Sequence, residues 1–358
     1  MIVKPENMNF SDKTFSMIIY GSPGVGKTTL ALSAPDPILL DFDRGVSRVR
    51  AEHRKATEFF FSKEVKELID QKKMSLPKAT EYMRKKYGPG MTEEDISRIH
   101  GFKSPYAEVL YDLNTSEEIE ACKTIIIDTG GSLVSFLKDW AMNEKGAKTK
   151  SGEFNSLKGF GFVKAEWASF TEYIKTVLHK NVIYIFHANE EKDKDGNPIQ
   201  RLVCEGSVRN SVWTPCDFGG FLQMIGDQRV ICFTPEQEYF AKGCHGIVGR
   251  IPVPALAPGA KNDFITRLFE TAKANIAAEA EGYNAIKAKY DEIMQFVKNI
   301  VDGVTDEQSA NEAVKTIPAM EHVLTSKKEA SAMLNAKAQS IGLKFNPKAL
   351  RYESVKEA

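Results

Sequence analysis

The sequence predicts an α/β protein with a mostly parallel central sheet. Four short apolar runs, rich in β-branched and aromatic residues, have the composition of strands buried on both faces. They are residues 14–20 (TFSMIIY), 38–42 (ILLDF), 123–129 (KTIIIDT) and 181–186 (NVIYIF). Helical segments are expected between them, which is the alternation of a parallel sheet with crossover helices.

Length and composition limit the function classes. The 358 residues leave room for one large domain and a smaller one, and 42% hydrophobic and 27% charged residues are typical of a globular protein. Lys and Arg together number 48, as do Asp and Glu together, so the chain is not a polycation. Any binding of nucleic acid must therefore come from a local patch.

Cysteine use and hydropathy predict a cytoplasmic protein. The five cysteines are scattered, with no C-x-x-C pair and no zinc spacing, so reduced thiols are expected. No apolar stretch approaches the length that spans a bilayer, and residues 1–13 carry no signal-peptide pattern. A membrane partner is not expected.

Residues 20–29 (YGSPGVGKTT) contain the pattern G-x-x-x-x-G-K-[ST] between an expected strand and an expected helix. Its glycines allow backbone N–H groups to point at a phosphate, and the helix N-terminus adds partial positive charge. We expect Lys27 to reach the β- and γ-phosphates of ATP and the Thr28 hydroxyl to ligate Mg²⁺. The alternative, a glycine-rich turn that binds nothing, is disfavoured by an acidic motif downstream. The expected nucleotide-binding residues are Gly21, Ser22, Pro23, Gly24, Val25, Gly26, Lys27, Thr28 and Thr29.

Two carboxylates follow expected strands. Asp128 ends an apolar run in the manner of a Walker B strand, and we expect it to hold Mg²⁺ and its water shell together with Thr28. Asp43 lies two residues beyond Asp41, on the same face at the edge of the sheet, and is the better candidate to orient or deprotonate the attacking water. The alternative for Asp43 is a strand-end turn without chemistry.

Two further polar residues are catalytic candidates because of their place on strands. His187 follows the run 181–186, at the tip of a strand next to the Walker B strand, where it could contact the γ-phosphate. The alternative is a structural histidine. Residues 229–234 (RVICFT) and 237–242 (QEYFAK) predict a β-hairpin with Lys242 at its far end.

Two segments are candidates for contact with single-stranded nucleic acid, in which cations follow the phosphates and rings stack on bases. Residues 145–161 are basic and glycine-rich with two phenylalanines, and the alternative is a surface loop that these rings anchor. Residues 188–212 are predicted to be a charged loop, and its acidic residues make the electrostatic signal mixed. The candidate DNA-contacting residues are Lys158, Phe160, Lys192, Lys194, Arg201 and Arg209.

The chain is predicted to form two domains. Residues 1–260 form the α/β domain, with a polar helical insertion at about 62–114 to which no chemistry is assigned. Residues 261–358 form a small helical region, in which apolar residues between 283 and 300 recur at a 3-4 heptad spacing. That face is expected to pack onto the first domain, with an interaction module as the alternative.

The motifs GSPGVGKTTLAL, ILLDFDRG, TIIIDT, VIYIFH and the pair VICFT and EYFAK resemble those of the phage RecA-like P-loop ATPases that act in single-strand annealing and recombination. The resemblance covers about residues 14–250. It implies a RecA-like core that hydrolyses ATP at a subunit interface of a ring or filament. The region after about residue 260 has no counterpart in it.

The resemblance also implies roles for single residues. It places the phosphate loop and Asp128 on ATP and Mg²⁺, and it places Asp43 where these proteins keep a catalytic Glu, which is longer by one methylene. His187 falls where they keep a polar residue that senses the γ-phosphate. Lys242 falls where a hairpin offers a lysine to the neighbour's ATP, and the loops near 145–161 and 188–209 fall where they contact DNA.

Two functions remain open. The first is an ATP-dependent protein that binds single-stranded DNA and promotes annealing or homologous recombination, with copies of itself and a single-stranded-DNA-binding protein as partners. The alternative is a P-loop ATPase switch or a small-molecule kinase that acts with a protein or metabolite. The balanced net charge slightly favours the alternative.

Overall fold

The computed structural model describes residues 12–354, which divide into two compact units, Asp12–Lys273 and residues 274–354. The expectation that the N-terminus lacks a signal peptide concerns residues that lie mostly outside this range. No helix in the described range is long and apolar enough to cross a membrane.

A mixed sheet of nine strands, counted over residues 12–354, forms the centre of the larger unit. Its order is β3-β2-β4-β5-β1-β7-β8-β9, and β6 pairs with the outer part of β5. Pairs along the path from β3 to β7 are parallel, and β8 and β9 add antiparallel partners. The predicted α/β class with a mostly parallel sheet is therefore confirmed. The strands are β1 Ser16–Gly21, β2 Pro37–Asp41, β3 Thr57–Glu58, β4 Thr124–Asp128, β5 Asn181–Lys192, β6 Pro198–Leu202, β7 Phe218–Ile225, β8 Gln228–Cys232 and β9 Arg250–Pro252.

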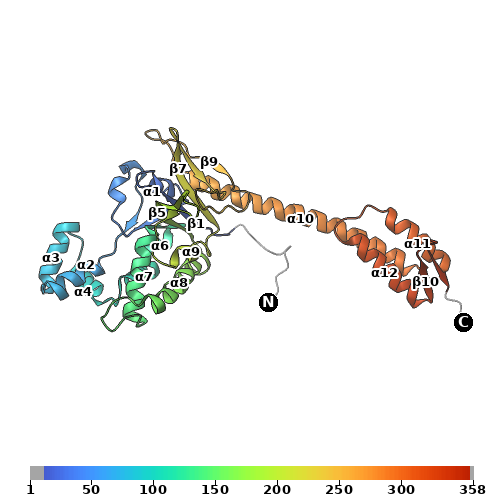
Figure 1. The fold of residues 1–358 in the computed structure, drawn as a ribbon, viewed down its shortest axis with the longest axis horizontal. Coiled ribbons are helices and arrows are strands. Elements are labelled where there is room, and N and C mark those ends of the chain that lie inside the picture. The colour runs from blue at the N-terminus through green and yellow to red at the C-terminus, as the bar shows by residue number, and fades with distance from the viewer. Residues whose placement is uncertain (1–11, 355–358) are drawn as a thin grey trace. The chain divides into compact units, whose positions relative to one another are not determined.

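Helices cover both faces of this sheet, which is why its central strands are apolar throughout. All residues of β1 and β4 are buried. One face packs against α5 (Pro105–Thr115), α7 (Gly130–Glu144) and α8 (Ser156–Glu172), and α7 and α8 run side by side in Figure 1. On the other face, Phe269 near the start of α10 (Phe264–Asp302) packs on Phe15 and Phe218.

The predicted helical insertion is confirmed between β3 and β4. It contains α2 (Ser62–Lys66), which continues as a π-helical turn, then α3 (Leu76–Tyr87) and α4 (Glu93–Gly101). Pro77 lies in the first turn of α3, and Thr92 caps α4 through a capping box with Asp95. These helices enclose a small hydrophobic core of their own. The insertion was predicted to reach about residue 114, but α5 packs in the main core of the larger unit. The short helix α6 (Glu117–Ala121) follows α5.

Three predicted connections are wrong. The loop predicted at residues 145–161 ends at Asn155, because α8 begins at Ser156, so Lys158 and Phe160 lie on a helix. Residues 188–212 are not a single loop, because β5 continues to Lys192 and returns through a turn as β6. Residues 229–234 do not pair with 237–242, because β8 pairs with β7 and β9 instead. The two-residue loop Gly226-Asp227, with Gly226 at φ +62°, joins β7 to β8 and is the stronger hairpin signal. Short α9 (Val208–Ser211) follows β6.

The smaller unit has a separate core. It comprises the later part of α10, then α11 (Glu307–Ala319) and α12 (Ser326–Ser340), which confirms the predicted helical character. A two-stranded antiparallel sheet of β10 (Leu343–Asn346) and β11 (Arg351–Ser354) was not expected. Valines of α10 and alanines of α11 and α12 pack there with Leu334 and Tyr352.

Candidate nucleotide-binding site

The phosphate loop joins β1 to α1 (Lys27–Ala31), in the strand, loop and helix order that the motif requires. Gly24 and Gly26 adopt φ values of +78° and +93°, which favour glycine. Gly21 is required for a different reason, because a Cβ there would lie 2.2 Å from the carbonyl oxygen of Leu222 on β7. The loop is thus fixed by its own backbone and by close contact with the neighbouring strand.

Lys27 lies buried within this loop. Its Nζ donates to the carbonyl oxygens of Gly21, at 3.0 Å, and Ser22, at 2.9 Å. Burial lowers the pKa of Lys27 to about 8, although the Asp128 carboxylate opposes the shift. An ammonium that is short of charged partners would gain from a phosphate oxygen beside it.

Thr28 and Asp128 meet as predicted. The Thr28 hydroxyl donates to Asp128 Oδ2 at 2.7 Å. Burial at the end of β4 raises the pKa of Asp128 to about 6; the hydrogen bond from Thr28 opposes this shift, while Asp41 and Asp43 add to it. A nearby cation would relieve this cost of ionisation.

The donor set at this position fits Mg²⁺. A hydroxyl and a carboxylate are the hard oxygen ligands that Mg²⁺ prefers, usually alongside water and substrate phosphates. Within residues 12–354 no cluster of three or more His, Cys, Asp or Glu could hold a metal by itself. Thr28 and Asp128 therefore suit an ion that arrives with a triphosphate.

Asp41 and Asp43 have different surroundings. Asp41 is buried and accepts hydrogen bonds from the backbone N–H groups of Gly45, at 2.9 Å, and Val46, at 2.8 Å, so it shapes the turn. Asp43 is exposed and accepts from the hydroxyls of Ser132, at 2.5 Å, and Thr129, at 3.2 Å. Both hydroxyls follow β4, so Asp43 lies at the same edge of the sheet as Asp128.

His187 lies beside the phosphate loop. Parallel pairing of β1 with β5 places it directly opposite Gly21. Burial lowers the pKa of His187, and the nearby Lys27 ammonium lowers it further. The ring is therefore neutral at pH 7. Its Nδ1 is buried and has no hydrogen-bond partner among the described residues. A neutral imidazole carries one ring N–H that can donate a hydrogen bond and one nitrogen that can accept one.

An arginine-rich cavity beside the loop was missed from the sequence. Its volume is about 370 Å³, and Arg229 of β8 lies close enough to Gly26 that a Cβ there would be 3.1 Å from the Arg229 Cζ. The Nε of Arg229 is buried without a partner among the described residues. No sequence spacing connects this strand with the loop. The cavity is lined by Gly24, Gly26, Thr29, Arg48, Arg50, His53, Arg229, Ala255 and Leu256.

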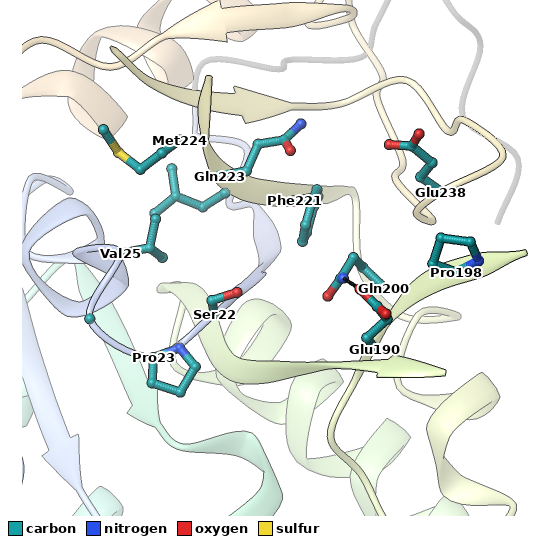
Figure 2. Close-up of a pocket in the computed structure, with 12 residues that line it drawn as sticks. Ser22, Pro23, Val25, Glu190, Pro198, Gln200, Phe221, Gln223, Met224 and Glu238 are labelled. Atoms are coloured by element: carbon teal, nitrogen blue, oxygen red, sulfur yellow. Dashed lines mark hydrogen bonds between the residues drawn. The ribbon is translucent and has the colours of Figure 1, made fainter. Parts of the chain in front are cut away.

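A second cavity, of about 640 Å³, adjoins the loop at Ser22 and Val25 (Figure 2). The β5–β6 hairpin contributes Glu190, whose Oε2 accepts a hydrogen bond from Gln200 Nε2 at 3.2 Å. Glu238 lies on another wall of the same cavity. Two carboxylates give this cavity an acidic character.

Lys242 is not brought to the phosphate loop of its own chain. Its backbone pairs with Gly219 near the amino-terminal end of β7, whereas the loop follows the carboxyl-terminal end of the parallel strand β1. The Lys242 amine donates to the carbonyl oxygen of Cys216. Because residues 229–234 and 237–242 do not form the predicted hairpin, Lys242 lies on an irregular segment.

The candidate DNA-contacting residues fall into two groups. Lys158, Lys192 and Lys194 are exposed, the first on α8 and the others at the end of the β5–β6 hairpin. Phe160 is half-buried and packs edge-on against Phe154 at 5.1 Å, which agrees with an anchoring ring.

The two arginines of the hairpin region are paired with a carboxylate. Glu191 accepts from Arg209 at 2.8 Å and lies 3.5 Å from Arg201. Contact with a phosphate backbone would have to compete with these ion pairs.

Comparison with known proteins places the larger unit in a family. Residues 13–245 match the family model described as an AAA domain. The chain belongs to this AAA-domain family. With its phosphate loop, it carries a P-loop ATPase domain. None of the curated proteins matches the sequence.

A solved structure with some likeness is the flagellar accessory protein FlaH from Methanocaldococcus jannaschii. It has 12% sequence identity, and the match covers 67% of this chain and 90% of that chain with a TM-score of 0.25. At this TM-score the likeness says nothing about function.

Proposed function

We propose that the protein binds ATP with Mg²⁺ and hydrolyses it. The observation that carries this proposal is the convergence of four strand ends on one edge of the sheet. The phosphate loop after β1, Asp43 after β2, Asp128 on β4 and His187 on β5 come together through parallel pairing. Ligands of open α/β sheets bind at this edge.

Each residue has a role that its surroundings support. Lys27 and the loop N–H groups hold the phosphates, and Asp128 orients the Thr28 hydroxyl. When bound, Mg²⁺ neutralises charge on the phosphoryl group being transferred. Asp43 takes the proton of the attacking water, because it is exposed at the edge of the sheet. Neutral His187 donates a hydrogen bond to the γ-phosphate.

The arginine-rich cavity suits the nucleobase and ribose. Planar guanidinium groups stack on aromatic rings, and Arg229 lies directly against the phosphate loop at Gly26. The cavity extends from Thr29 on α1, so it is continuous with the phosphate site.

We extend the proposal to single-stranded DNA, annealing and recombination. β5 is one strand from the buried core through His187 to Lys192, so it connects the proposed γ-phosphate contact with the hairpin tip. The exposed Lys192 and Lys194 at that tip would contact phosphates. Since Lys242 does not reach its own phosphate loop, its predicted role requires a homo-oligomer, a ring or filament. A phage origin and a single-stranded-DNA-binding protein as partner belong to the same proposal.

Binding of a fluorescent dT oligonucleotide tests the DNA part of this proposal. With ATP and Mg²⁺ at low salt, the double variant Lys192→Ala/Lys194→Ala should bind about tenfold more weakly and show a shallower salt dependence. The matched control is Lys327→Ala/Lys328→Ala, which removes two exposed lysines of the smaller unit. Absence of binding by the unmodified protein would refute DNA binding and leave the ATPase proposal standing.

The alternative function, a switch or small-molecule kinase with a protein or metabolite partner, is supported by the acidic cavity of Figure 2. Glu190 and Glu238 would repel a nucleic-acid phosphate and attract a cationic group beside the phosphate loop. ATP turnover that rises with such a partner and ignores single-stranded DNA would decide in its favour.

A further inference from the structure

Arg44 follows Asp43 directly and has an unusual backbone conformation. Its φ is +55°, in the left-handed region that residues other than glycine rarely adopt. Such a conformation persists when the surrounding structure holds it in place. The contacts of the Arg44 side chain show what holds it.

The Arg44 guanidinium lies among three aromatic rings. Its Cζ is 4.4 Å from the ring centre of Tyr87, 4.6 Å from Phe61 and 5.7 Å from Phe59. One of its terminal nitrogens donates to the carbonyl oxygen of Phe60 at 3.2 Å. A cation is attracted to ring faces at these distances, and Arg is well suited to stacking on them.

The rings around Arg44 belong to the helical insertion or to the segment that enters it. Tyr87 is the last residue of α3, and its hydroxyl donates to Glu64 of α2 at 2.6 Å. Lys86 also donates to Glu64, at 2.7 Å, and Arg44 lies 3.9 Å from the same carboxylate. The insertion therefore holds the cage in place, and its helices share a hydrophobic core of their own.

The catalytic side of the same turn is fixed separately. Asp41 accepts from the N–H groups of Gly45 and Val46, and Asp43 accepts from two hydroxyls after β4. Arg44 is thus the one residue of the 43–45 turn whose side chain connects it to the insertion in the described range. Because Arg44 follows Asp43 directly, the cage also fixes the backbone next to this carboxylate.

We propose that Arg44 is a positioning residue for Asp43, and that the helical insertion holds Arg44 in place through the aromatic cage. The inference rests on the proposed role of Asp43 as the base. It gives the insertion, to which the sequence assigned no chemistry, a part in positioning Asp43. Loss of the cage should leave nucleotide binding intact and slow the chemical step.

Single-turnover hydrolysis and nucleotide affinity, measured on the full chain, test this inference. Arg44→Ala should lower the hydrolysis rate at least tenfold, since misplacing a catalytic group is costly, and change the Kd for Mg-ATP by less than threefold. Tyr87→Leu, which removes one ring but keeps Arg44, should have the same kind of effect. Tyr87→Phe keeps the ring face and should restore most of the rate.

Two controls separate positioning from general damage. Arg98→Ala removes another arginine of the insertion, 5.4 Å from the Tyr111 ring, and should match the unmodified protein. Adding Arg44→Ala to Asp43→Asn should cause no further loss, because both changes remove the same group from its working position.

Several outcomes would overturn the inference. Full activity of both Arg44→Ala and Tyr87→Leu would show that the cage does not position Asp43. Multiplicative losses in the double variant, or equal losses of rate and affinity, would show a merely structural role. No ATP turnover by the unmodified protein, or no effect of Asp43→Asn, would remove the proposed function as well.

Discussion

At the scale of single residues, Asp128 makes the site sensitive to pH. Its pKa of about 6 in the folded protein exceeds the ordinary value of 3.8, so the folded state holds a proton that the unfolded state releases. Without nucleotide, stability should therefore fall as pH rises from about 4 to about 6. Binding of Mg-nucleotide should show the opposite trend, because it needs the ionised carboxylate.

Asp128→Asn isolates this effect, since the amide oxygen can still accept from Thr28. At pH 7 and without nucleotide, the variant should be more stable than the unmodified protein by an amount on the order of 2 kcal/mol. The difference should vanish near pH 4. Urea unfolding at the two pH values measures it. A variant that is less stable at pH 7 would contradict the assignment of burial as the cause of the shift.

At the scale of elements, the phosphate loop depends on close packing between β1 and β7. Gly21→Ala would place a Cβ 2.2 Å from a backbone oxygen of β7, which cannot move without distorting the sheet. Gly24→Ala meets open space and suffers only from its φ of +78°. We expect Gly24→Ala to lower the free energy of unfolding by about 1–2 kcal/mol, and Gly21→Ala to lower it by more than twice as much. Equal losses in denaturant unfolding would argue against the contact with β7.

The central strands and the phosphate loop could be predicted from the sequence. Buried parallel strands are continuous apolar runs, so residues 14–20, 38–42, 123–129 and 181–186 were identified correctly. The β5–β6 hairpin was missed because its residues are mostly exposed or half-buried, and its charged side chains resemble those of a loop. The phosphate loop and Asp128 are recognisable because their chemistry requires a local pattern.

Contacts between distant segments could not be predicted in this way. Arg229 of β8 lies against Gly26 of the phosphate loop, and Arg44 contacts Tyr87 of the insertion. Both pairs are far apart in the sequence, so no local spacing of residues indicates them. For Lys242 the sequence indicated a strand at residues 237–242, but the structure has only an isolated bridge from Lys242 to Gly219. An apolar alternation does not show whether a partner strand is within reach.

At the scale of the whole molecule, the two compact units have separate cores. The smaller unit packs Val297, Ala313, Leu334 and Tyr352 within itself. Residues 274–358 alone should therefore give a helical circular dichroism spectrum and a cooperative thermal transition. Residues 1–273 should keep the nucleotide-binding site. A fragment 274–358 without a transition would show that its core needs the larger unit.

Steady-state ATP hydrolysis with and without a poly-dT oligonucleotide tests the proposed coupling of ATP turnover to single-stranded DNA. The unmodified protein should hydrolyse ATP with Mg²⁺ and do so faster with DNA. Lys27→Ala should lose the activity in both conditions, because the loop then lacks its phosphate-binding ammonium. Hydrolysis that depends on Lys27 but ignores DNA would contradict the coupling, and the absence of any hydrolysis would contradict the proposed reaction itself.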